Sequence, residues 1–127
     1  PMHLADEIAA VGLTPAMRRV FNRGLSAVAC ADGSMDEPER LAIETLLGGK
    51  LGGNAPREPL ESLWPHAELF VRACIHVALV DGHYRVEEAR AVSLIAHRLG
   101  LSAQRLAALE KQVFDKLEAA SQQRRRA

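Results

Sequence analysis

The sequence predicts an all-α fold, a single-domain bundle of six or seven helices. Ala and Leu, with 21 and 17 of the 127 residues, outnumber Val plus Ile, with 13, which favours helix over strand. Apolar residues recur at helical spacing, for example Met17, Val20, Phe21, Leu25 and Val28. No segment alternates apolar and polar residues over the length of a strand. The length suits one domain, with a core over about 15–118.

Start and stop signals set the order of the helices. Thr14 is a candidate N-cap before Pro15, and Asp36 with Glu39 forms a candidate capping box. Gly100 suits a helix end, and Ser102 can cap the last helix. The expected helices are 4–11, 15–31, 36–48, a short one at 60–63, 65–80, one ending at Gly100 and one starting after Ser102.

Two segments are expected to lack helix. Residues 48–59 contain four glycines and two prolines and predict a mobile loop. Residues 120–127, with three consecutive arginines, predict a basic, disordered tail. The remaining candidates are assigned packing or surface roles: Cys30 and Cys74 as small buried hydrophobes, Trp64 as a packing residue at a helix junction, His76 and His97 at the core edge, and His83 as an exposed turn residue.

Composition excludes several classes of protein. The formal net charge of +0 argues against a dedicated nucleic-acid binder. Two cysteines form neither a disulfide framework nor a zinc motif, which favours a reducing compartment. No apolar run approaches the ~18 residues of a membrane-spanning helix, and no signal peptide is visible. A cytoplasmic protein without a membrane span is therefore expected. Motifs of serine hydrolases, zinc proteases and phosphate-binding loops are missing as well.

An internal repeat is the most informative feature of the chain. Residues 27–40 and 76–89 both place Asp-Gly after an apolar helix end and a glutamate six residues after the glycine, with a constant offset of 49 residues. Each copy predicts a helix, a tight turn and a second helix whose first turn carries the glutamate. We expect the two hairpins to be related by an approximate two-fold axis, with their acidic turns as neighbours.

The repeat is not an EF-hand. Asp-Gly followed by glutamate matches the second half of such a loop, where oxygen ligands stand at positions 5 and 12. The residues at positions 1 and 3 supply no side-chain oxygen; they are Val28, Cys30, Val77 and Leu79. A hard cation would therefore need ligands from both turns together, or several waters.

The pattern resembles the tellurite-resistance protein B (TerB-like) family. The resemblance is carried by Ala-Asp-Gly-x5-Glu at 31–39, Ala-Leu-Val-Asp-Gly-x5-Glu at 78–88 and Leu-Gly-Leu-Ser at 99–102. It implies a helical, non-enzymatic, cytoplasmic bacterial protein of stress or tellurite-resistance systems, with an acidic surface that binds divalent cations. Its expected partners are other proteins, including membrane-associated complexes, with homo-oligomers allowed and no specific nucleic acid. A related module occurs in some J-domain co-chaperones.

The candidate metal ligands are five carboxylates of the two turns. On the family pattern they are Asp32, Glu39, Asp81 and Glu88, to which Asp36 is added; calcium or magnesium is the expected cofactor. Arg85 departs from the pattern, because a small capping residue is expected there.

Three alternatives to a cation site stay open. Glu39 and Asp36 are also explained as a capping box, and Asp32 and Asp81 as turn residues that accept backbone hydrogen bonds. The protein would then be a pure protein-interaction module. If the turns meet, arginines (Arg40, Arg85 or Arg90) could neutralise the carboxylates in place of a cation. A hydrolase with paired carboxylates is the third alternative, and it would require a cleft with raised carboxylate pKa values.

Overall fold

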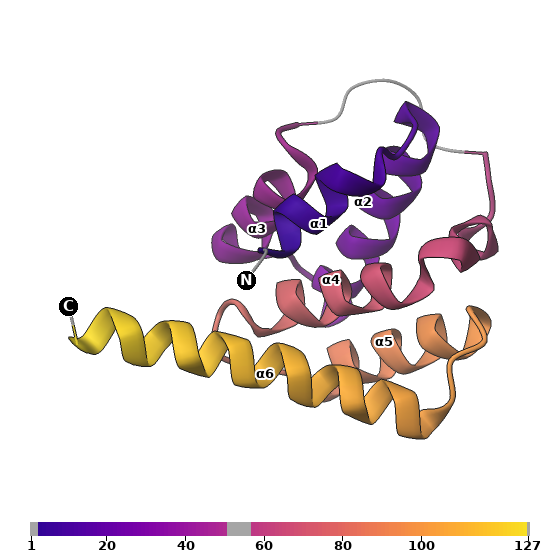
Figure 1. The fold of residues 1–127 in the computed structure, drawn as a ribbon. Helices are drawn as coiled ribbons and strands as arrows, with labels where there is room; N and C mark the ends of the chain where they lie inside the picture. Colours follow the sequence, from indigo (N-terminus) through magenta and orange to yellow (C-terminus); the bar gives the residue numbers. More distant parts are fainter. Residues whose placement is uncertain (1–2, 51–56, 127) are drawn as a thin grey trace.

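Helix α4 (Ala67–Leu79) is the centre of the molecule, and the other helices pack around it. The computed structural model describes residues 3–50 and 57–126. On one side of α4 lie α1 (Leu4–Val11), α2 (Pro15–Ala29) and α3 (Glu37–Leu47), and on the other α5 (Val86–Arg98) and α6 (Ala103–Arg126), as Figure 1 shows. A 3-10 helix, η1 (Leu60–His66), precedes α4. In the described residues the fold is therefore all-α, with six α-helices, as the sequence predicts.

The two halves of the repeat are the hairpins α2–α3 and α4–α5. Their first helices cross at the core, where Gly24 faces Phe70 so closely that a Cβ at Gly24 would lie 2.3 Å from the ring's Cζ. The Phe70 ring packs edge-on against Phe21, with a centroid distance of 4.9 Å. Both rings are fully buried. This close crossing fixes how the hairpins sit and hence where their turns meet.

The predicted capping signals are confirmed. Thr14 accepts a hydrogen bond from the Met17 amide at 3.2 Å. Ser102 accepts one from the Arg105 amide at 3.0 Å. Gly100, with a φ of 84°, follows the end of α5. Local backbone chemistry thus determines most helix bounds.

The structure corrects four expectations. Pro65 does not start α4 but lies inside η1, because the chain forms a 3-10 helix from Leu60 onward and α4 begins two residues later. Trp64, expected to pack at a helix junction, is 70% exposed, because it lies on the outer side of η1, where it lines a groove beside α1. Cys30 is exposed because α2 ends at Ala29, whereas Cys74 is buried as expected. His97, expected at the core edge, is exposed, whereas His76 is only partly exposed.

The C-terminal segment is helical where a disordered tail is expected. Helix α6 continues through Arg126, because alanine, glutamine and arginine are all good helix formers. The expectation of a mobile loop at 48–59 falls largely on 51–56, outside the described residues. Within the described ranges, no helix is long and apolar enough to cross a membrane.

Candidate metal centre

Both repeats form the same tight turn. Gly33 and Gly82 have positive φ angles of 109° and 86°, and their amides donate to the carbonyls of Cys30 and Leu79 at 2.9 and 3.0 Å. In each turn the aspartate before the glycine accepts a hydrogen bond from the amide two residues later. This distance is 3.4 Å for Asp32 and 2.9 Å for Asp81. Glycine is required here because other residues avoid such backbone angles.

The helix that follows each turn carries the repeated glutamate in its first turn. Asp36 accepts from the Glu39 amide at 3.0 Å, and Glu39 Oε1 accepts from the Asp36 amide at 3.2 Å, which completes the predicted capping box. In the second repeat Glu88 Oε1 accepts from the Arg85 amide at 3.0 Å. The Arg85 side chain has no acceptor atom, so this box has only one of its two hydrogen bonds.

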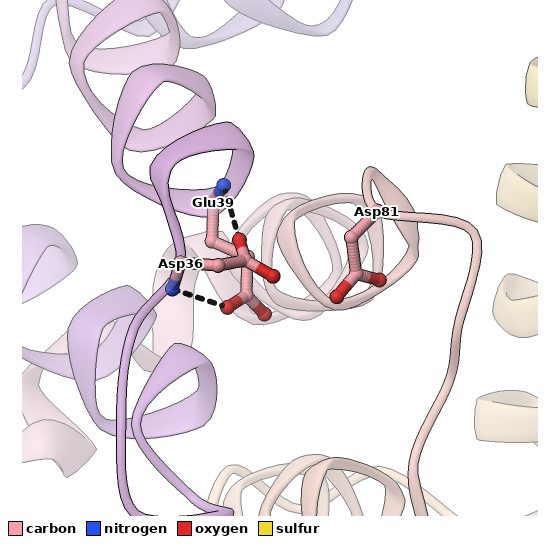
Figure 2. Close-up of side chains that lie close together, drawn as sticks. All are labelled: Asp36, Glu39 and Asp81. Carbon is pink, nitrogen blue, oxygen red and sulfur yellow. Dashed lines mark hydrogen bonds between the residues drawn. The ribbon is translucent and has the colours of Figure 1, made fainter.

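The two turns meet, and three carboxylates from them converge. One carboxylate oxygen from each of Asp36, Glu39 and Asp81 lies within 4.8 Å of the other two. Figure 2 shows Asp81, from the turn after α4, facing the cap residues of α3. We call these three residues the acidic triad. The expectation that the turns are neighbours is confirmed.

The other two candidate ligands lie beside the acidic triad but have different partners. Asp32 forms an ion pair with Arg85, with 3.2 Å between Oδ2 and Nε. Glu88 is 1% exposed and lies close enough to Glu39 for their side chains to interact. Of the five carboxylates, the structure therefore brings three into one potential ligand set.

Burial of Glu39 makes the ionised form of its carboxyl unfavourable. Glu39 is 3% exposed, and its Oε2 atom has no hydrogen-bond partner among the described residues. Burial, followed by the nearby Glu88 carboxyl, raises the pKa of Glu39 to about 8. By contrast, the hydrogen bond from the Glu39 amide lowers the pKa of Asp36, so that Asp36 stays ionised. At neutral pH Glu39 therefore carries a proton, unless a cation compensates its negative charge.

Several carboxylates elsewhere in the described residues have arginine partners. Glu7 pairs with Arg72 across α1 and α4 at 2.9 Å, and Arg40 pairs with its own helix neighbours Glu37 and Glu44. Further arginine pairs join α5 and α6 to η1 and α4: Arg98–Glu61 and Arg105–Glu68. Within residues 3–50 and 57–126, no carboxylate of the acidic triad forms such a pair with lysine or arginine. The acidic triad therefore combines unpaired carboxylates with their convergence and with the burial of Glu39.

The chemistry of the acidic triad suits a hard cation. Carboxylate oxygens are the preferred ligands of calcium and magnesium, and three of them occupy one side of a coordination shell. His83 follows the turn but is exposed, and no described histidine or cysteine joins the group. The donor set therefore contains oxygen alone, which disfavours zinc and copper.

The sequence reasoning missed one partner of the second turn. The Tyr84 hydroxyl donates to Glu110 Oε2 on α6 at 2.8 Å, which ties this turn to the last helix. No repeat or motif marks Glu110, because it lies on α6, outside the two hairpins.

In comparisons with known proteins, no family model, no curated protein and no solved structure matches the chain.

Proposed function

We propose that this chain is a TerB-like, non-enzymatic helical module that binds one divalent cation, calcium or magnesium, at Asp36, Glu39 and Asp81. The observation that carries the proposal is the Glu39 side chain. It is almost fully buried, it faces two other carboxylates, and one of its oxygens lacks a hydrogen-bond partner among the described residues. Buried polar atoms are normally satisfied, and a cation satisfies this one and compensates its charge.

Binding would connect the two halves of the repeat. Asp36 and Glu39 belong to the first turn of α3, whereas Asp81 follows α4. A cation held by all three joins the hairpins where their turns meet. Three protein oxygens leave several coordination positions for water, so we expect a dissociation constant in the range of weaker calcium sites, about 10⁻⁵ to 10⁻³ M.

This role fits a regulatory or scaffold protein better than an enzyme. A cavity of about 590 Å³ lies between α1, η1 and the start of α4, and its lining includes neither Glu39 nor Glu88. The raised pKa of Glu39 is explained by its burial and by Glu88. In a cytoplasmic stress system of the tellurite-resistance type, such a module would report cation levels to protein partners, including membrane-associated complexes.

Calorimetric titration of the metal-free protein with calcium and with magnesium tests the proposal. We expect one site per chain and a rise in the unfolding temperature, because a ligand that binds only the folded state stabilises it. Asp81→Asn and Glu39→Gln should each weaken binding at least about ten-fold, since each removes one ligand charge. Both variants keep the acceptor atom that their backbone hydrogen bonds need.

Asp6→Asn is the matched control, because Asp6 is an exposed carboxylate in the first turn of α1. It should bind like the wild type. If the wild type gives neither heat nor a thermal shift at millimolar calcium or magnesium, the cation site is wrong. The turns would then be purely structural, and a protein-interaction module would remain.

A further inference from the structure

The repeat assigns every residue of the acidic triad a counterpart 49 positions away. Asp36 corresponds to Arg85 and Glu39 to Glu88. Asp81, which lies in the second repeat, corresponds to Asp32 in the first. The 49-residue offset therefore maps the acidic triad onto a second group, which we call the counterpart cluster: Asp32, Arg85 and Glu88.

The counterpart cluster has corresponding contacts but a different charge. In the acidic triad, Asp36 faces Asp81 across the two turns. In the counterpart cluster Arg85 faces Asp32 across the same turns, at 3.2 Å. Glu88 accepts from the Arg85 amide, just as Glu39 accepts from the Asp36 amide. A guanidinium thus occupies the position of a third carboxylate.

We infer that the guanidinium of Arg85 is a covalently attached counter-ion that takes the place of a second divalent cation, so that the chain binds one cation where its repeat provides for two. This inference rests on the proposed function, because it assumes a cation at the acidic triad. It assigns Arg85 the role of setting both the number of bound cations and the affinity of the remaining site.

The structure supports a counter-ion role for Arg85 in two ways. Its Nε atom lies 3.2 Å from Asp32 Oδ2, so the positive charge sits where the two turns meet. The same charge opposes a cation at the acidic triad. In addition, the Arg85 side chain is 49% exposed and that of Asp32 29%, so the pair adds little to stability and we expect Arg85 variants to fold.

Replacing Arg85 by aspartate is the direct test. Arg85→Asp supplies the missing carboxylate and an N-cap acceptor for α5, which completes the capping box with Glu88. Native mass spectrometry and calorimetry with calcium should then count two cations per chain instead of one. Asp32→Asn in addition to Arg85→Asp should restore a single cation, because it removes one of the three ligands of the new site.

A neutral replacement provides a second measurement. Arg85→Gln should keep one calcium per chain and bind it about ten-fold tighter, because a unit charge near a divalent ion is removed. Arg90→Gln is the matched control. Arg90 is exposed on α5, the helix that Arg85 precedes, and it forms no ion pair with the described residues. It should leave affinity within about two-fold of the wild type. If Arg85→Asp does not fold, Arg85→Gln decides the question.

The outcomes separate this inference from the proposed function. A single calcium with unchanged affinity in both Arg85 variants overturns the counter-ion role and leaves the cation site standing. Binding by Arg85→Asp alone, with none by the wild type, contradicts the proposed function and also the inference that the natural chain binds one cation. Binding by neither protein overturns both.

Discussion

Replacing Glu39 by glutamine tests the electrostatics of the acidic triad while preserving its shape. The glutamine keeps an oxygen to accept from the Asp36 amide and can donate its amide hydrogens to Glu88. What it loses is the ability to ionise. Any difference between the two proteins that depends on pH therefore reports the charge of Glu39.

The expected magnitude follows from the pKa of Glu39, which rises from the ordinary 4.5 to about 8 on folding. Between these values the folded chain holds a proton that the unfolded chain has released, so the free energy of unfolding falls as pH increases. The contribution is fully present below about pH 4.5 and is lost once pH passes about 8. At 1.36 kcal/mol per pKa unit, the wild type loses about 3 kcal/mol from this group between pH 5 and 8.

Urea unfolding in the presence of a chelator measures this effect. At pH 5 the Glu39→Gln protein should match the wild type closely, and at pH 8 it should be more stable by about 3 kcal/mol. Glu87→Gln, an exposed position in the first turn of α5, is the control and should follow the wild type at both pH values. Parallel stability curves for wild type and Glu39→Gln would refute the argument, since Glu39 would then ionise normally.

Three further substitutions test the packing and the turns. Gly24→Ala should destabilise by about 1–3 kcal/mol in thermal unfolding, because its Cβ would overlap the Phe70 ring; equal or higher stability would contradict the close helix crossing. Tyr84→Phe should cost about 1.5–3 kcal/mol, because the hydroxyl's hydrogen bond to the Glu110 carboxylate is lost; an unchanged urea midpoint would argue against this tie to α6. Asp36→Ala should cost about 1 kcal/mol through loss of the N-cap, measured without metal, whereas Asp36→Ser should restore most of it.

Helix bounds could be predicted because they depend on neighbouring residues. The Asp36 cap and the ends of α3 and α5 involve atoms within a few positions of each other, so sequence spacing determines them. The environments of Trp64 and Cys30 were predicted wrongly for the opposite reason. Their burial depends on where η1 and the end of α2 sit relative to distant helices, which no local pattern specifies.

The candidate site was predictable only in outline. The repeat predicts that two acidic turns meet, and they do. It does not predict which carboxylates gather, because that depends on the angle at which α2 and α4 cross. The sequence marked Arg85 as a departure from the pattern, yet only the structure shows that it pairs with Asp32 rather than with its own helix.

The repeat gives a physical reason for the different charges of its two halves, although their turns make the same backbone hydrogen bonds. The repeat brings two buried glutamates, Glu39 and Glu88, into contact, and two adjacent carboxylates cannot both ionise without compensation. Two identical acidic clusters would double that cost at the crossing of the hairpins. With Arg85 beside Asp32, one carboxylate of the counterpart cluster is compensated within the chain. Under the proposed function, folding still gains from an external cation at the acidic triad, so stability would depend on that cation.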